Sequence, residues 1–325
     1  MLIFDAHCDT LTRAVNEGKN LSANSLHWDV ARAGQYDGFV QVLAIWQDPD
    51  KVKPSFEGAM RYILAAEKFQ REAPRLKLCR NASELEGGLQ EKKVCAFLAV
   101  EGGECLEGEI ENLRLFYQAG VRVLTLTWNH ANGLGDGADE PENRGLTPFG
   151  REVMQWMQQN GMVVDISHAG ERAFYDCIDI ARKPIIASHS NARRIHDHPR
   201  NLRDEQLLAI AKTGGVIGMN FYTKFIGPPG KADLTALIGH IEHILGIAGE
   251  DSLGLGADFD GMYSLPPPIV GVENLYSLFN TLARMNYSDE ILEKIASGNF
   301  LRVFGNALEQ TGNNMDKPVQ ASEND

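Results

Sequence analysis

Asp5, His7 and Asp9 stand at alternate positions near the start of the chain, within the stretch DAHCDT. The apolar residues before them, MLIF, indicate a buried strand, and alternate side chains of a strand point to the same side. We therefore expect the three groups to converge. Two carboxylates beside an imidazole are costly to bury unless a positive charge joins them. The spacing predicts a metal site with His7 and Asp9 as ligands, whereas a lone histidine would indicate a hydrogen-bonded core residue.

Further side chains that can bind metals follow other apolar runs, namely Glu101, His168, His189 and Asp258. The two glycines after Glu101 leave space and backbone freedom beside its carboxylate, which favours a site over a buried ion pair. Asp260 shares the stretch GADFDG with Asp258, and we expect it to cap a turn. His7, Asp9 and these four groups form the candidate site.

The remaining histidines and the cysteines are expected to have structural roles. Cys8 lies between His7 and Asp9, so it should point to the opposite side as a small buried apolar residue. Five histidines lack a place at a strand end and are expected to face solvent or cap turns: His27, His196, His198, His240 and His243. His240 and His243 are one helical turn apart, which is typical of the polar face of a helix.

Eight apolar runs predict the strands that position these groups. They are LIFDAH (2–7), FVQVLAIW (39–46), VCAFLAVE (94–101), VRVLTLTW (121–128), MVVDISH (162–168), PIIASHS (184–190), GVIGMNF (215–221) and LGLGADFD (253–260). Helical patterns lie between most of them and after the last, at 147–161, 170–181, 203–215, 233–249, 272–286 and 288–308.

Strands alternating with helices in this number predict an α/β fold, a (β/α)₈ TIM barrel of the metal-dependent hydrolase type. A doubly wound sheet is the alternative, but no glycine-rich phosphate turn follows the first strand. The C-terminal ends of barrel strands face one mouth, where the active sites of this fold lie. The six groups are therefore expected to meet at that mouth.

Length and composition limit the remaining possibilities. We expect one barrel domain over residues 1–310 and a polar, frayed tail over residues 311–325. The net charge of −13 disfavours nucleic acid and anionic membrane surfaces as partners. We find no transmembrane run and no signal peptide. The five cysteines are an odd number without a C-x-x-C pair, which favours a reduced, cytoplasmic protein.

Together the motifs resemble those of the renal-type (membrane) dipeptidases, zinc peptidases of the amidohydrolase superfamily. The matching stretches run from residue 5 to about residue 304: DAHCDT, AVEGGE, LTLTWN, DISH, SHSNARRIHDHPRNL, MNFY, GADFDG and GNFLRVF. The resemblance implies a soluble, bacterial-type hydrolase that acts on a small-molecule dipeptide. Family members are often dimers, so a homodimer is a further expectation.

The resemblance also implies a role for each candidate ligand. Glu101 matches a carboxylate that bridges two Zn²⁺ ions, and Mn²⁺ or Co²⁺ could fill the same nitrogen and oxygen sites. His7 and Asp9 match the other ligands of one ion, and His168 and His189 match those of the second. A hydroxide shared by the two metals would attack the amide.

Two further residues match groups that act on the substrate. Asp258 matches the family's catalytic carboxylate, which takes the proton of the water and returns it to the leaving amine. Arg200 matches an arginine that holds the substrate's free carboxylate by a two-point contact, which would limit cleavage to very short peptides. Without the resemblance, Arg200 would be interpreted as a surface arginine in a basic loop.

The chain departs from the family at the end of the fourth strand. Where the renal enzymes have LTH, with a histidine thought to bind substrate near the oxyanion, this sequence has LTWNH. Trp128 takes the matching position, and His130 follows two residues later as either a substitute donor or an ordinary loop histidine. Tyr222, in the matching stretch MNFY, is expected to contact substrate as well.

Three functions compete. The first is a zinc dipeptidase for dipeptides with a free C-terminal carboxylate, with tolerance of a D-residue at that end. The second keeps both metals but acts on another small amide, lactam or N-acyl amino acid, because Trp128 replaces the family histidine. The third is a non-catalytic binding protein on the same barrel, which the complete set of candidate ligands disfavours.

Overall fold

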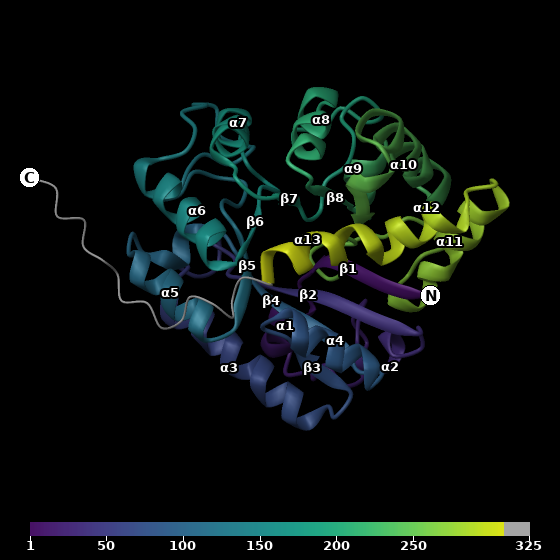
Figure 1. Cartoon of the computed structure of the whole chain (residues 1–325), viewed down its shortest axis with the longest axis horizontal. Helices are drawn as coiled ribbons and strands as arrows, with labels where there is room; N and C mark the ends of the chain where they lie inside the picture. The colour runs from purple at the N-terminus through teal and green to yellow at the C-terminus, as the bar shows by residue number, and fades with distance from the viewer. Residues whose placement is uncertain (309–325) are drawn as a thin grey trace, which may run out of the picture.

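Eight parallel strands form a closed barrel in the computed structural model, which describes residues 1–308 (Figure 1). Each strand pairs with its neighbours in the ring, and the β1–β9 and β2–β4 pairings complete it. The strands of the ring are β1 (Leu2–Cys8), β2 (Gly38–Trp46), β4 (Val94–Glu101), β5 (Val121–Thr125), β6 (Val163–Asp165), β7 (Ile186–Ala187), β8 (Val216–Met219) and β9 (Leu253–Leu255). The predicted barrel and its eight strands are confirmed. The predicted tail, residues 311–325, lies outside the described residues.

The strands differ from the prediction in number and length. A short additional strand, β3 (Leu76–Leu78), pairs with β4 on the outside of the ring. Its three residues are too few to show a strand pattern in the sequence. Several predicted strands also end early, since β6 stops at Asp165 and β7 contains two residues. Residues predicted at these strand ends therefore lie in the loops that follow.

Helices surround the ring. They are α1 (Thr10–Asn16), α2 (Val30–Ala33), α3 (Phe56–Glu72), α4 (Ala82–Gln90), α5 (Ile110–Gln118), α6 (Pro148–Asn160), α7 (Glu171–Ile180), α8 (Asp204–Lys212), α9 (Thr223–Ile226), α10 (Leu234–Ala248), α11 (Leu275–Arg284), α12 (Asp289–Glu293) and α13 (Asn299–Leu308). α6 begins as its sequence predicts, because the Thr147 hydroxyl accepts a hydrogen bond from Gly150 N and Pro148 occupies the first turn. The pattern predicted at 288–308 is divided, since a π-helical turn (Lys294–Gly298) separates α12 from α13.

An aromatic cluster fills the barrel at the amino-terminal ends of its strands. Phe4 of β1 and Phe97 of β4 point into this interior, and α13 packs against β1, β8 and β9 (Figure 1). From α13, the ring of Phe304 lies 4.8 Å from the ring of Phe4 and 5.0 Å from that of Phe97. The helix thus closes the end of the barrel opposite the candidate site. No helix within residues 1–308 is long and apolar enough to cross a lipid bilayer.

We expect Phe304→Ala to lower the free energy of unfolding by about 3–5 kcal/mol, because it removes a fully buried ring and leaves a cavity. Urea denaturation of the metal-loaded protein measures this change. Leu208→Ala, on the 41 % exposed face of α8, is the control and should cost less than about 1 kcal/mol. Equal losses in the two variants would contradict the role of α13 as the closure of the barrel.

Candidate metal centre

Five of the predicted groups bring their ligand atoms together at the carboxyl-terminal mouth of the barrel. Two sets of three buried residues each have ligand atoms within 4.8 Å of one another, and Glu101 belongs to both. The first set adds His7 and Asp9, and the second adds His168 and His189. Glu101 Oε2 lies 3.5 Å from His7 Nε2, whereas Oε1 lies 3.1 Å from His168 Nε2 and 3.7 Å from His189 Nε2. Each carboxylate oxygen therefore faces a different set.

The prediction that Asp5 converges with His7 and Asp9 is wrong. The pairing of β1 with β2 shifts register between Asp5 and Cys8, which breaks the simple alternation of side chains. Asp5 is fully buried and accepts hydrogen bonds from Gln41 Nε2 and from the backbone of Ala257. Its carboxylate ties neighbouring strands together and is absent from the ligand clusters of the described residues. Cys8 is buried in the apolar layer, as predicted.

The loops that carry His168 and Asp258 turn sharply. Both residues have left-handed backbone conformations, with φ of 67° and 59°. Such conformations are unfavourable for residues with a Cβ, by roughly 1–3 kcal/mol, and they cluster at functional sites. The turns direct both side chains back over the barrel mouth, three residues beyond the ends of β6 and β9. Gly102, after Glu101, also has a positive φ of 92°, but Leu134 fills the space beside Gly103 that was expected to be open.

The tautomers of His168 and His189 follow from their outer partners. His168 Nδ1 donates to Asn129 Oδ1 at 2.6 Å, because an amide oxygen can only accept. The Ser188 hydroxyl donates to Asp165 Oδ2 at 2.6 Å and accepts from His189 Nδ1 at 2.8 Å. Both Nε2 atoms are therefore left with a lone pair.

These lone pairs test whether the site fits a metal. His168 Nε2 and His189 Nε2 lie 2.8 Å apart, and Glu101 Oε1 faces both. Three acceptors at this separation repel one another unless a cation lies among them. On the other side, His7 Nε2 and Asp9 Oδ1 are buried and have no hydrogen-bond partner in the part of the chain that the structure describes. Imidazole nitrogens and carboxylate oxygens are the ligands of catalytic zinc sites, so the donor set fits divalent metal ions.

The pKa shifts of the three histidines differ between the two ligand sets. Burial, assisted by Arg200, lowers the pKa of His168 to about 4. Burial likewise lowers the pKa of His189 well below its ordinary value, which keeps its imidazole neutral. For His7, burial lowers the pKa, but the facing carboxylates of Glu101 and Asp9 outweigh it and raise the pKa overall. The carboxylate-rich side thus attracts positive charge most strongly.

The support around His189 depends on close backbone contact. Asp165 accepts hydrogen bonds from the backbone amides of Ser167 and Ser188, at 3.0 and 2.8 Å. A Cβ on Gly218 or Gly256 would lie 1.9 or 1.7 Å from the carbonyl oxygen of Ser188, so only glycine allows this approach. Asp165 forms a third ligand-like group with His7 and His189. Because its oxygens already accept four hydrogen bonds, we regard it as a support for His189.

Asp258 lies at the edge of the first set. Its Oδ1 is 4.0 Å from His7 Nε2, and its Oδ2 accepts a hydrogen bond of 2.9 Å from Asn220 Nδ2. Burial and the neighbouring carboxylates of Asp9 and Glu101 raise the pKa of Asp258 to about 8. A carboxyl group with a raised pKa is of the kind that general acid and base catalysis uses. Asp260 instead joins loops, because it accepts from Thr10 Oγ1 and from the backbone of His27.

Arg200 is buried beside the second set, which the interpretation as a surface arginine does not anticipate. It is 5 % exposed, and one of its terminal nitrogens donates to the carbonyl oxygen of His189 at 3.4 Å. The loop that carries it is held by His240, for which the sequence predicts exposure to solvent or a role in capping a turn. The side chain is fully buried. His240 Nδ1 accepts from Ala192 N at 3.1 Å, and Nε2 donates to Ile226 O at 2.9 Å. The apolar residues around His240 in its helix were the signal for this burial.

The other predicted substrate contacts lie near the mouth but differ in burial. The half-buried ring of Trp128 is 6.1 Å from the ring of His168 and 5.2 Å from that of Trp46. His130 is 64 % exposed and faces Glu140 at 3.5 Å. The ring of Tyr222 packs against that of Phe225 at 5.0 Å.

Comparison with known proteins identifies similar chains. The sequence model of the family "Membrane dipeptidase (Peptidase family M19)" matches residues 1–319. An uncharacterized protein from the pqqA 5′ region of Klebsiella pneumoniae is 38% identical over 73% of this chain and 91% of its own. An uncharacterized dipeptidase of Schizosaccharomyces pombe is 33% identical over 94% of this chain and 71% of its own.

Solved structures agree with these sequence matches. A dipeptidase described as a metallopeptidase of family M19 superposes with a TM-score of 0.86 at 26% identity, over 95% of this chain and 99% of its own. A metallopeptidase from Rhodobacter sphaeroides, liganded with a phosphinate mimic of the dipeptide L-Ala-D-Ala, has a TM-score of 0.83 at 26% identity, over 94% and 98%.

We expect elemental analysis of the zinc-loaded protein to find about two ions per chain, and about one after His189→Ala. Removal of the ions with a chelator should lower the Tm, because ligands that bind only the folded state stabilise it by mass action. His243→Ala is the matched control, since this histidine pairs with Asp204 at 2.7 Å, outside both ligand sets. An unchanged metal content in His189→Ala would contradict the second set.

Proposed function

Because the chain belongs to the membrane dipeptidase family, peptidase family M19, a family of metallopeptidases, we propose that it is a zinc-dependent dipeptidase. Its substrates are dipeptides with a free C-terminal carboxylate. The observation that carries this proposal is the meeting of two metal-ligand sets, an adjacent carboxyl group and a buried arginine at one end of the barrel.

In this proposal Glu101 would contribute to the binding of both metal ions. His7 and Asp9 would hold the first ion, and the 3.4 Å approach of Asp9 Oδ2 to His7 Nε2 supports their pairing. His168 and His189 would hold the second, supported by their facing Nε2 atoms. Zinc suits this mixture of nitrogen and oxygen ligands, and Mn²⁺ or Co²⁺ are possible substitutes. When bound, the ions supply Lewis-acid polarisation of the scissile carbonyl and lower the pKa of a water molecule.

Asp258 is the proposed general acid and base. It accepts a proton from the attacking water and donates it to the leaving amine, which needs a carboxyl group within hydrogen-bond reach of both. The hydrogen bond from Asn220 holds one oxygen and leaves the other directed toward His7. The amide of Asn220 therefore orients the group that moves the proton.

Arg200 is proposed to bind the substrate's C-terminal carboxylate. A guanidinium group offers two parallel donors to a carboxylate, which the single ammonium of lysine cannot reproduce. Its burial beside His189 places this positive charge close to the second ligand set. A carboxylate held there must be one residue from the scissile bond, so longer peptides are excluded.

Three residues at the barrel mouth bear on how the substrate is contacted: Trp128, His130 and Tyr222. Trp128 and Tyr222 are proposed to contact the substrate with their half-buried rings. For His130, the exposure of 64 % and the contact with Glu140 favour the ordinary loop histidine over a substitute donor. Tolerance of a D-residue at the C-terminus is part of the proposal, since the R. sphaeroides relative is liganded with a mimic of L-Ala-D-Ala.

A second candidate function retains the metals and changes the substrate. Trp128, three residues after the end of β5, replaces the histidine that the family resemblance leads us to expect, so a small amide, lactam or N-acyl amino acid is the alternative. Turnover of an N-acyl amino acid, with none on a panel of dipeptides, would favour it.

We also place the protein in the cytoplasm. Its five cysteines are all buried and free of disulfides: Cys8, Cys79, Cys95, Cys105 and Cys177. Five reduced thiols are typical of a chain that works in a reducing compartment.

We expect Asp258→Asn to lower kcat on dipeptides by about 10²–10⁴-fold, because the amide cannot accept the proton. Steady-state kinetics with the zinc-loaded protein measures this loss, and the metal content should stay near that of wild type. A kcat within threefold of wild type, at full metal content, would exclude Asp258 from the proton transfer.

We expect Arg200→Lys to lower kcat/KM for a dipeptide acid by about 10–100-fold, as one of two charge-assisted hydrogen bonds is lost. The corresponding C-terminal dipeptide amide should be a poor substrate of wild type and should change little in the variant. Equal effects on acid and amide would show that Arg200 does not bind the carboxylate.

A further inference from the structure

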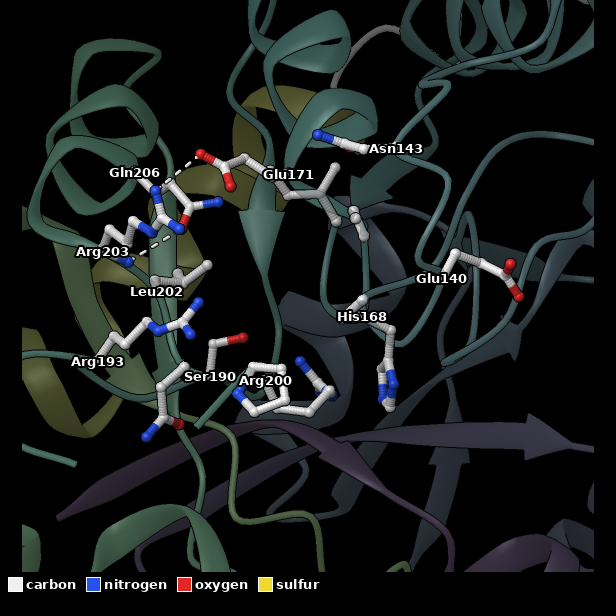
Figure 2. Close-up of a pocket in the computed structure, with 16 residues that line it drawn as sticks. Glu140, Asn143, His168, Glu171, Ser190, Arg193, Arg200, Leu202, Arg203 and Gln206 are labelled. Carbon is white, nitrogen blue, oxygen red and sulfur yellow. Dashed lines mark hydrogen bonds and ion pairs between the residues drawn. The ribbon is translucent and has the colours of Figure 1, made fainter. Parts of the chain in front are cut away.

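A cavity of about 200 Å³ lies beside the second ligand set, between the loops that follow β5, β6 and β7 (Figure 2). His168 and Arg200 line it close to the ligand sets, and Glu171 and Arg203 line it further away (Figure 2). Ser190, the residue after His189, also lines it and is drawn next to Arg200. The cavity has room for one small amino-acid residue.

Three buried polar atoms in this lining have no hydrogen-bond partner among the described residues: Ser190 Oγ, Arg200 Nε and Asn201 Oδ1. The amide oxygen of Asn201 can only accept, so Ser190 Oγ and Arg200 Nε are the two that can donate to a ligand. Ser190 is 1 % exposed and Arg200 is 5 % exposed, so bulk water does not satisfy either group. The neighbouring serines differ, because the Ser188 hydroxyl donates to Asp165 and the Ser167 hydroxyl accepts from His189 N. A buried polar group without a partner is unfavourable, and a ligand that bonds both Ser190 Oγ and Arg200 Nε would remove this penalty.

The charges of the lining identify the kind of ligand. Arg193 pairs with Asp197 at 2.7 Å, and Arg203 pairs with Glu171 at 3.0 Å. Arg200, in contrast, has no carboxylate within ion-pair distance in the described part of the chain, and its guanidinium lies 5.6 Å from the ring of Phe225. A carboxylate could therefore accept hydrogen bonds from both the unpaired guanidinium of Arg200 and the unpartnered hydroxyl of Ser190.

Hydrogen bonds fix the loop that carries Ser190 and Arg200. Ala192 and Leu202 form a parallel bridge, which closes the loop between Ser190 and Arg200 at its base. Asn201 Nδ2 donates to the carbonyl oxygens of His196 and Phe225, at 2.9 and 2.8 Å. The buried His240 secures the same loop through Ala192 N. A loop fixed in this way can present two donors to a ligand without reordering.

We propose that Ser190 and Arg200 form a two-point cradle for the substrate's C-terminal carboxylate, in which the Ser190 hydroxyl donates to one oxygen and the Arg200 guanidinium to the other. The inference rests on the proposed dipeptidase function and adds Ser190 to it as a specificity-determining residue. Ser190 separates substrates with a free carboxylate from their amides, and it takes no part in proton transfer.

Kinetics of zinc-loaded Ser190→Ala on L-Ala-D-Ala and its C-terminal amide test the cradle. The KM for the acid should rise by about tenfold or more, the effect of losing one hydrogen bond to a charged group. The kcat, the metal content and the KM for the amide should stay within about twofold of wild type. Ser190→Thr, which keeps the hydroxyl, should restore much of the affinity. Ser252→Ala, at a buried serine immediately before β9, is the matched control.

Three results would overturn the cradle. An unchanged KM for the acid in Ser190→Ala means that the hydroxyl does not touch the carboxylate. A fall in kcat with loss of metal means that Ser190 supports His189 instead. If wild type hydrolyses no dipeptide, the proposed function fails and the cradle fails with it. If wild type hydrolyses dipeptides but Ser190→Ala has an unchanged KM for the acid, only the cradle is disproved and the proposed function stands. The two failures are therefore distinguishable.

Discussion

The mutual repulsion of buried lone pairs is the constraint on which the barrel mouth depends. His168, His189 and Glu101 direct acceptor atoms at one another within 2.8 to 3.7 Å. Asn129 and Ser188 occupy the other ring nitrogens and so fix the lone pairs in place. Such an arrangement is unfavourable in a buried site unless cations bind there. The outer hydrogen bonds therefore determine which ligand the site accepts.

The two ends of the barrel have different roles, one in stability and one in the candidate site. At the amino-terminal ends of the strands, α13 closes the interior with closely packed aromatic rings, which form an apolar cluster separate from the larger core. At the carboxyl-terminal ends, strands as far apart in sequence as β1 and β9 deliver polar groups to one place. The strained turns at His168 and Asp258 are tolerated because the closed ring over-determines the backbone beneath them.

The substrate side of the mouth has its own rigidity. Arg200 is useful as a carboxylate receptor only if its loop stays ordered, and the buried His240 holds that loop by hydrogen bonds to two backbone groups. Burial lowers the pKa of His240 to about 4, so the neutral ring keeps its acceptor nitrogen for Ala192 N across the physiological range. The loop after β7 therefore links the second ligand set to the group that selects the substrate.

The sequence alone determined the barrel and the metal-binding character of its mouth, because apolar runs ending in His, Asp or Glu have one economical explanation. Such local patterns made candidates of His7, which has Asp9 two residues on, and of Glu101, which precedes two glycines. The hydrogen bonds of His240, the diversion of Asp5 to Gln41 and the lack of partners for Ser190 Oγ and Arg200 Nε within residues 1–308 could not be predicted in this way. Each depends on which distant segment lies opposite the side chain, and on a register shift within β1. Only the closed tertiary structure decides these contacts, since hydrogen-bond geometry is set by tenths of an ångström across segments that the sequence separates.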